Sequence, residues 1–228
     1  MAKQADLNDP QDDGPAAIKA VRTSWRRRQI VAAATRLLET RGFHEMSVND
    51  LATEAGISVG TIYQYMSAKE DILLLVFLDI LEEYRRRLPE AMEGIEDPIE
   101  RLIAGFRAYC RIVDDRHSAA ALAYRESKTL SEDGLEQVMA LEVETTELLA
   151  ACIREADGQG VLIDGVDVTL LAYDLVVLAH MWALKHWYLA ERFDVEVYAD
   201  AQLRVILRAA VRGRVLPRYE KLLGASRV

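Results

Sequence analysis

The segment from Ser47 to Lys69 holds side chains that can contact DNA, together with the residues needed to arrange them as a reading surface. Ala52 supplies the small side chain that a close crossing of two helices requires. Gly56, four residues later, supplies the positive φ of a sharp turn. Ile62, six residues further on, supplies an apolar anchor for the second helix. These three features at this spacing predict a helix-turn-helix whose second helix enters the major groove.

The second helix of this pair presents small and polar side chains once Ile62 faces inward. Gln64 suits the edge of an adenine and Val59 suits a thymine methyl group. Nearby hydroxyl, ammonium and guanidinium groups suit phosphates, which position a protein without specifying sequence. Tyr63 is expected to pack under the first helix, whereas Tyr65 is assigned equally to phosphate contact and to packing. The expected DNA contacts are Arg26, Arg27, Arg28, Ser47, Ser58, Val59, Gly60, Thr61, Gln64, Tyr65 and Lys69.

Positive charge is concentrated around this segment, although the whole chain carries a net charge of -9. Residues 16–70 carry a net charge of +3, whereas residues 1–15 carry -3 and the remainder carries -9. This distribution suits a protein that holds a polyanion at one end only. The arginine run 26–28 either contacts DNA or is an ordinary solvated helix start.

The rest of the chain shows no pattern of a catalytic, metal or cofactor site. It has no Gly-rich phosphate loop, nucleophile elbow or paired acid–base spacing, and His180 and His186 lie about 240° apart around a helix. No catalytic residue, metal or cofactor is therefore expected, with a helical dimeric enzyme and a purely structural helical dimer as alternatives. Cys110 and Cys152 fit no metal or redox spacing, which indicates reduced core residues of a cytoplasmic protein.

The most apolar stretch, residues 168–189, is expected to be a buried helix and not a membrane span. Asp174, His180, Lys185 and His186 interrupt it, and such groups are costly inside a bilayer. The acidic N-terminus also lacks the apolar segment of a secretion signal. A carboxylate in so apolar a helix needs a partner, so Asp174 is expected to pair with an Arg or His of its own subunit or across a dimer.

Helical periodicity runs through most of the chain and predicts an all-α fold. Residues 1–20 are acidic and aperiodic, which indicates a disordered arm. Residues 21–67 are expected to form the DNA-binding domain, and residues 68–228 a larger helical bundle. A break is expected at 89–94, and Pro217 is expected to end the regular pattern. The expected helices span about 24–41, 48–55, 58–65, 68–88, 97–113, 118–128, 131–157, 167–191 and 195–214.

Residues 26–75 closely resemble the DNA-binding domain of TetR/AcrR-type regulators. The resemblance implies an all-α homodimer whose first three helices bind a palindromic operator in double-stranded DNA. It implies a fourth helix that links this domain to a regulatory bundle, and a dimer interface built from the last two helices. It also implies repression relieved by a small molecule. The matching elements are Gly42-Phe43, Ser47-Val48, Leu51-Ala52, Ala55-Gly56-Ile57-Ser58, Gly60-Thr61-Ile62-Tyr63, Tyr65 and Lys69-Glu70-Asp71.

The resemblance places an effector site in the C-terminal bundle. Residues 180–189, HMWALKHWYL, look like a stretch of relatives linked to acyl-CoA and to fatty or aromatic acid metabolism. The effector is therefore expected to be an acyl-CoA or another apolar acid; a multidrug-responsive regulator of an efflux gene and a regulator without a small ligand are the alternatives. His180 is either a satisfied core histidine or a ligand donor. The expected lining residues are Phe106, Tyr109, Cys110, Tyr124, Leu141, Leu148, Tyr173, Val177, His180, Met181 and Leu184.

Overall fold

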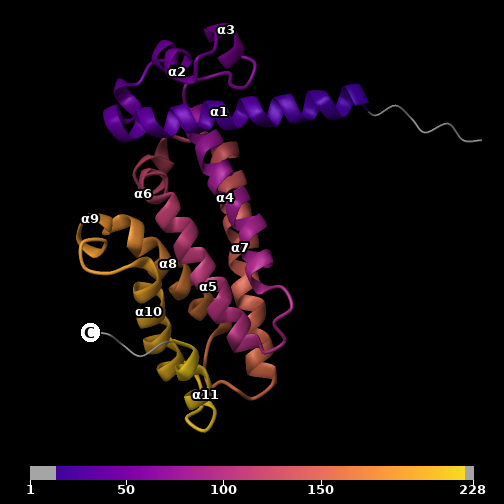
Figure 1. The fold of residues 1–228 in the computed structure, drawn as a ribbon, viewed down its shortest axis with the longest axis vertical. Helices are drawn as coiled ribbons and strands as arrows, with labels where there is room; N and C mark the ends of the chain where they lie inside the picture. The colour runs from indigo at the N-terminus through magenta and orange to yellow at the C-terminus, as the bar shows by residue number, and fades with distance from the viewer. Residues whose placement is uncertain (1–13, 224–228) are drawn as a thin grey trace, which may run out of the picture.

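The computed structural model describes residues 14–223 and confirms the expected all-α fold. A small head formed by α1 to α3 lies across one end of a longer helical body (Figure 1). Apart from helices and turns, the described residues contain one isolated antiparallel bridge, between Leu162 and Val211. The elements are α1 (Gly14–Glu45), α2 (Val48–Ala55), α3 (Val59–Ile62), α4 (Asp71–Met92), α5 (Pro98–Asp115), α6 (His117–Glu126), η1 (Ser127–Thr129), α7 (Glu132–Gly158), α8 (Val168–Leu184), α9 (His186–Leu189), α10 (Val195–Ala210), α11 (Leu216–Glu220) and η2 (Lys221–Leu223).

Local capping sets the bounds of α2 and the start of α3. The Ser47 Oγ accepts a hydrogen bond from the Asp50 backbone N–H at 3.1 Å, and the Asp50 carboxylate accepts one from the Ser47 backbone N–H at 3.0 Å. Gly56 ends α2 in the left-handed region, with φ +64°. Ser58 then caps α3, because its Oγ accepts from the Thr61 backbone N–H at 3.1 Å. These short-range interactions turn the chain between the two helices.

The head is held together by apolar faces that meet in one core. In α1, Ile30, Ala34 and Leu38 are buried at a spacing of four residues. Leu51 of α2 and Ile62 of α3 are fully buried against the same core. Burying a large apolar side chain contributes about 1.5–3 kcal/mol relative to leaving it exposed. The head therefore presents the outer side of α3 from a well-packed base.

Helix α4 joins the head to the body. Its first turn buries Ile72 and Leu73, and later turns bury Phe77, Tyr84 and Leu88. It packs against α1 in the head and against α5, α6 and α7 in the body. Figure 1 shows it running from the head along the body beside α7. Any displacement of α4 within the body must therefore reach the head.

The body is a bundle in which α4, α5, α7 and α8 pack on one another and α10 covers α5. Asp97 caps α5 by accepting hydrogen bonds from the backbone N–H groups of Ile99 and Glu100 at 2.9 and 3.0 Å. Gly105 allows a close approach, since a Cβ there would lie 2.9 Å from Met92 Sδ. The end of α4 and the middle of α5 therefore meet closely.

Two expectations about the N-terminal half need correction. Helix α1 begins at Gly14, so residues 14–20 are helical where a disordered arm was expected; the remainder of that arm, 1–13, lies outside the described residues. Pro89 does not end α4. It lies exposed in the last turn, where water can bond the carbonyl that a proline leaves unpaired.

The C-terminal helices are shorter than their hydrophobic pattern predicted. The segment 167–191 is divided at Lys185, whose φ of -119° and ψ of 22° separate α8 from α9. Helix α10 ends at Ala210, where the chain turns into the bridge formed by Val211. Pro217 lies in the first turn of α11 and does not end the regular structure, since a proline is tolerated at that position.

Helix α8 has one buried and one outward-facing side, although it is apolar nearly all round. Ala172, Leu175 and Ala179 are buried, whereas Leu170 and Val177 are 65% and 58% exposed. Asp174 also lies exposed on α8, so the expectation of a buried carboxylate with a partner was wrong for this chain taken alone. Within residues 14–223, no helix combines the length and the apolar character that crossing a membrane requires.

Candidate DNA interface and buried cavity

The exposed side of α3 and of the turn after it forms a compact surface without charged groups. Ile62 is fully buried and Ala52 is nearly so, as the helix-turn-helix pattern predicted. Gly60 and Gln64 are exposed, and Thr61 is half-buried with its Oγ1 2.8 Å from Ser58 Oγ. We call this the α3 surface; it comprises Ser58, Val59, Gly60, Thr61, Tyr63 and Gln64.

The structure places the two tyrosines after α3 differently. Tyr63 is 55% exposed, so the expectation that it packs under the first helix was wrong. Tyr65 is half-buried and packs against the core. The reason is that α3 ends at Ile62 and continues as a turn, so the positions of a longer helix do not apply. Tyr63 is thus a DNA-contact candidate that the sequence reasoning missed.

Ser47 lies at the start of α2, and Lys69 lies in the segment between α3 and α4. The Lys69 Nζ donates a hydrogen bond to the His44 carbonyl at 3.2 Å and lies 4.7 Å from the centre of the Phe43 ring. Ser47 is exposed at the start of α2, with its hydroxyl engaged by Asp50. The ammonium is therefore positioned by α1, and it would contact a phosphate from this position.

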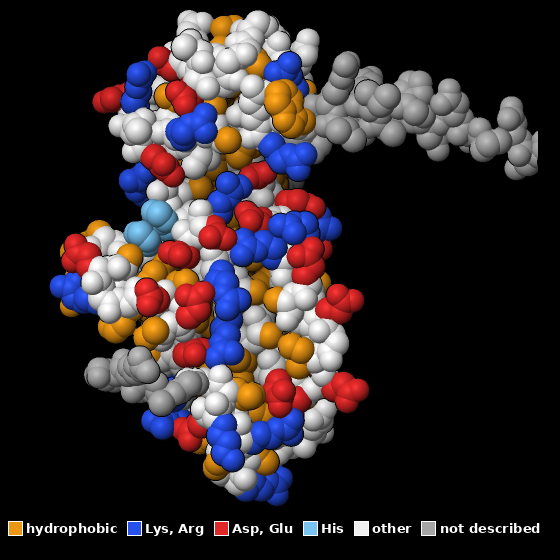
Figure 2. Space-filling view, viewed as in Figure 1, with side chains coloured by type: hydrophobic (Ala, Val, Ile, Leu, Met, Phe, Trp, Pro, Cys, Tyr) orange, Lys and Arg blue, Asp and Glu red, His pale blue; other side chains and the backbone are white. Residues whose placement is uncertain are grey.

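The three arginines that precede the first buried turn of α1 have two kinds of surroundings. Arg26 donates to Gln29 Oε1 at 2.9 Å, and Gln29 in turn donates to the Ala55 carbonyl at the end of α2. Arg27 and Arg28 instead line a groove that they share with acidic side chains of α4. The structure thus does not bring these two arginines to the α3 surface. Figure 2 shows basic and acidic side chains mixed over both head and body on the face in view.

The body holds a cavity of about 230 Å³ between α4, α5, α6, α7 and α8, which is partly open to solvent. Of the expected lining residues, Tyr109, Tyr124 and His180 border it. Phe106 and Cys110 are buried in the core away from it, and helix α8 turns most of its expected contributors elsewhere. The expected residues that do not line the cavity are Phe106, Cys110, Leu141, Leu148, Tyr173, Val177, Met181 and Leu184.

The lining residues that the sequence reasoning missed come mainly from two helices. Each helix contributes four residues at positions i, i+3, i+4 and i+7, which marks a single helical face. That periodicity was the available signal, although it does not tell which two faces meet. Smaller contributions come from α6 and η1. The missed residues are Phe77, Ile80, Leu81 and Tyr84 of α4, Leu135, Val138, Met139 and Glu142 of α7, and Ala120, Ala123 and Ser127.

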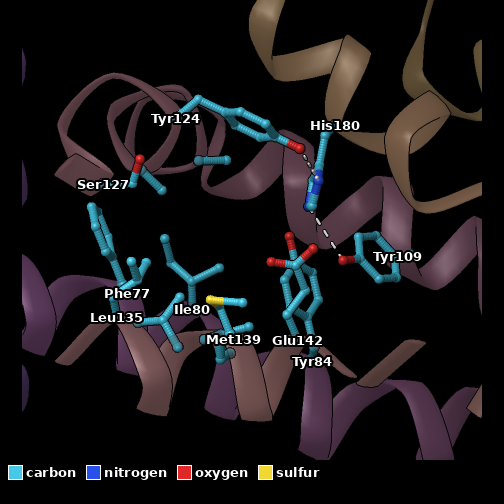
Figure 3. Close-up of a pocket in the computed structure, with 14 residues that line it drawn as sticks. Phe77, Ile80, Tyr84, Tyr109, Tyr124, Ser127, Leu135, Met139, Glu142 and His180 are labelled. Carbon is cyan, nitrogen blue, oxygen red and sulfur yellow. Dashed lines mark hydrogen bonds between the residues drawn. The ribbon is translucent and has the colours of Figure 1, made fainter. Parts of the chain in front are cut away.

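One end of the cavity is polar (Figure 3). His180 lies between two hydroxyls, with its Nε2 3.2 Å from the Tyr109 Oη and its Nδ1 2.9 Å from the Tyr124 Oη. Burial lowers the pKa of His180 to about 4, so the ring is neutral near pH 7. The rings of Tyr84 and Tyr109 stack with centroids 4.3 Å apart. Burial also raises the pKa of the Glu142 carboxyl, which faces this end.

A second polar cluster lies where α5, α6 and α9 meet, and it contains residue types that ligate metals: Asp114, His117 and His186. The two imidazole rings stack almost parallel, with centroids 3.7 Å apart. The Trp182 Nε1 already donates to Asp114 Oδ1 at 2.7 Å. Ring nitrogen lone pairs lie in the ring planes, and parallel planes share no point. The cluster as arranged therefore does not direct both histidines at one ion.

A three-helix head presents the α3 surface, and α4 joins this head to an all-helical body with a ligand-sized cavity. This architecture is that of a helix-turn-helix transcription regulator. Residues 30–76 match the bacterial regulatory proteins of the tetR family, and residues 96–210 match the tetracyclin repressor-like C-terminal domain. The chain belongs to the TetR family of DNA-binding transcriptional regulators, which are not enzymes.

Similar proteins agree with this assignment along most of the chain. The transcriptional regulator HbdR of Aromatoleum sp. is 37% identical over 182 residues, which cover 80% of this chain and 79% of HbdR. The crystal structure of AibR with isovaleryl coenzyme A and operator DNA has a TM-score of 0.67, with 23% identity over 79% of this chain and 97% of AibR. FadR of Bacillus subtilis, in complex with stearoyl-CoA, has a TM-score of 0.69 with 21% identity over 78% of this chain and 96% of FadR. The two structures show that the fold is shared.

Proposed function

We propose that this chain is a homodimeric repressor that binds a palindromic operator and is released from it by an acyl-CoA. The position of α4 supports a coupling between the cavity and the DNA-binding head. Its first turn is packed in the head, and its residues Phe77 and Tyr84 line the cavity. A molecule that fills the cavity presses on α4 and thereby shifts the head relative to the body. An effector needs only a few kcal/mol of preference for the shifted state to change operator occupancy.

The composition of the cavity supports an acyl group as the part that enters. Phe77, Ile80 and Leu135 make one side apolar. Met139 is 57% exposed at the border, which provides a way in from solvent and leaves space outside for a polar carrier such as CoA. Two structurally similar regulators, AibR and FadR, were crystallised with acyl-CoA thioesters.

An apolar stripe on the outside of the body supports dimer formation. Leu170, Val177 and Leu184 recur every seven residues on α8, and all three are exposed in the single chain. Val197 and Val205 are exposed on the neighbouring helix α10. Exposed apolar side chains in such number on adjacent helices mark a surface that a partner covers. A two-fold pair would place two α3 surfaces about 34 Å apart, or a multiple of this, which requires a palindromic site.

The experiment measures binding of the full-length protein to an inverted repeat from the region upstream of its own gene, by fluorescence anisotropy at fixed salt. A series of acyl-CoA thioesters from acetyl to stearoyl is added, with free CoA as control. We expect at least one thioester to weaken operator binding tenfold or more. Operator affinity that stays unchanged across the whole series would contradict the proposal. A response to lipophilic drugs alone would assign the chain to multidrug-responsive regulators instead.

Filling the cavity separates DNA binding from the effector response. The substitution Ala123→Trp places a large side chain at a half-buried lining position. We expect operator affinity within threefold of wild type, and a response that needs at least tenfold more thioester. Ala151→Trp, at an exposed position of α7, is the matched control and should respond as wild type does. An Ala123→Trp protein with an unchanged response would show that the effector binds elsewhere.

A further inference from the structure

The part of the polar end around Tyr84 and Tyr109 is closed, whereas Tyr124 beside it is 50% exposed. Tyr84 and Tyr109 are 2% and 1% exposed, whereas Leu135 and Met139 at the opposite side are 37% and 57% exposed. A ligand that enters past the exposed pair therefore brings its leading end to the tyrosines. In Figure 3 the Glu142 carboxylate lies beside Tyr84 and Tyr109, below His180. The leading end of the ligand thus meets polar groups and not an apolar wall.

Two of these polar groups have no hydrogen-bond partner among the described residues. The Tyr84 hydroxyl is fully buried and meets no hydrogen-bond geometry with any described residue, although its ring stacks on that of Tyr109. The Glu142 side chain is half-buried, and burial is the one influence that raises the pKa of its carboxyl. Buried polar groups are paired in nearly all folded proteins, so an unpaired one at a cavity wall points to a group supplied from outside.

His180 adds a constraint on hydrogens. A neutral imidazole has one N–H donor and one acceptor nitrogen. Of the two tyrosines that flank it, one must donate to the ring and the other must accept from it. The ring is therefore fully used by Tyr109 and Tyr124 and leaves the ligand to Tyr84 and Glu142.

We propose that the effector carries a hydroxyl group at its leading end, which accepts a hydrogen bond from Tyr84 and donates one to Glu142. This inference rests on the proposed function and specifies its ligand class: a hydroxylated acyl group, not a plain alkyl one. An alkyl terminus leaves the Tyr84 hydroxyl and the Glu142 carboxyl without a hydrogen-bond partner and excludes water from them. An ammonium group supplies donors only, so the Tyr84 O–H still lacks an acceptor. A hydroxyl both donates and accepts, and it satisfies both groups with one atom.

The test compares CoA thioesters that differ in one terminal group. Hexanoyl-CoA, 6-hydroxyhexanoyl-CoA, 6-aminohexanoyl-CoA and 6-oxohexanoyl-CoA are bound to the full-length protein and followed by calorimetry; shorter and longer chains are compared in the same way. We expect the hydroxyl form to bind at least tenfold tighter than the plain form of the same length, since a site built to bond a hydroxyl rejects the analogue without it. Tighter binding of the plain, amino or oxo form would overturn the inference.

Variants assign the preference to the two residues. Tyr84→Phe removes only the hydroxyl, and Glu142→Leu replaces the carboxyl by an apolar group of similar size. Each is expected to bring the hydroxyl and plain thioesters within threefold of each other. Tyr188→Phe, at an exposed tyrosine of α9, is the matched control and should keep the wild-type preference. A preference that survives both cavity variants would overturn the assignment.

A probe without CoA separates this inference from the proposed function. Melting temperatures are measured with 1-hexanol, hexylamine and hexanal, because a ligand that binds the folded state raises them. If no thioester binds, the acyl-CoA proposal fails on its own. The hydroxyl inference then stands if the alcohol stabilises wild type more than the amine and the aldehyde do, and fails if it does not.

Discussion

His180 joins two walls of the cavity, because its one neutral ring contacts the hydroxyls of Tyr109 on α5 and Tyr124 on α6. It accepts from one and donates to the other, so Tyr109 and Tyr124 cannot both donate to it. From the sequence, this histidine is either a satisfied core residue or a ligand donor. The geometry gives it a third role, in which it orients the tyrosines of the cavity wall.

Acidification is expected to destabilise the folded chain through His180. The unfolded imidazole takes up a proton near pH 6.5, whereas the folded one stays neutral down to about pH 4. Protons therefore favour the unfolded state within this window, and stability is lost as the pH falls through it. The loss is of the order of 3 kcal/mol in the free energy of unfolding.

Denaturant titrations between about pH 4 and pH 7 measure this effect. His180→Gln does not titrate there, so wild type should lose stability relative to the variant as the pH falls. A difference between the two proteins that stays constant across the window would contradict the assignment.

At the α3 surface, Gln64 is the residue expected to carry base specificity. Replacing it with alanine should cost about 1–3 kcal/mol of discrimination at one base-pair position and leave other positions unchanged. Binding to a set of operators with single base changes measures this. Gln137→Ala, at an exposed position of α7 in the body, is the control. Uniform weakening on all operators would instead make Gln64 a phosphate contact.

Lys69 is expected to show the opposite behaviour. Its ammonium donates a hydrogen bond to the His44 carbonyl and adds positive charge to the head. Lys69→Ala should weaken binding to all sequences alike and lower the salt dependence by about one phosphate contact. A salt titration on specific and random DNA measures both effects. A change in base preference would contradict this role.

At the scale of elements, the turn between α2 and α3 depends on a glycine. Gly56 has φ +64°, so Gly56→Ala should cost about 1 kcal/mol in the free energy of unfolding even though the space beside it is open. Gly158, at the end of α7, has a negative φ and equally open surroundings, so Gly158→Ala should stabilise the chain by about 0.5 kcal/mol. Chemical denaturation of the two variants measures both signs. Equal effects would show that the turn is not strained by a side chain.

Elements set by short-range interactions could be predicted from the sequence. The bounds of α2 follow from Ser47, Asp50 and Gly56, all within ten residues, and the structure places them as expected. The end of α4 could not be predicted, because Pro89 breaks a helix only where its lost hydrogen bond cannot be replaced. The length of α3 was overestimated because the chain after Ile62 continues as a turn and not as a helix. The role of Tyr63 was misassigned for the same reason.

The cavity was harder to predict because it depends on which helical faces meet. The faces of α4 and α7 that contain Tyr84 and Glu142 are visible in the sequence, but their pairing across the body is not. The sequence of α8 does not indicate which side of the helix faces the cavity, since the helix is apolar nearly all round. His180 on that helix lines the cavity, whereas Val177, three residues earlier, is exposed on the outside.

At the scale of the whole molecule, the proposed dimer uses the outward side of α8 to bring two heads together. Val177→Glu places a charge in the middle of the apolar stripe, and in a two-fold pair the same charge appears on both chains. We expect sedimentation to report a single chain at micromolar concentration, and operator affinity to fall at least a hundredfold with the helical content unchanged. Val143→Glu, the same substitution at an exposed position of α7, is the control. A variant that stays paired would place the interface elsewhere.

The exposed stripe of Leu170, Val177 and Leu184 also has a consequence for how a cell sets the output of the gene. If the chain binds its operator only as a pair, the active form grows with the square of the amount synthesised while most chains are single. Halving synthesis would then remove about three quarters of the active form. A modest change in expression would thereby change the amount of the active form more than proportionally, even when no effector is present.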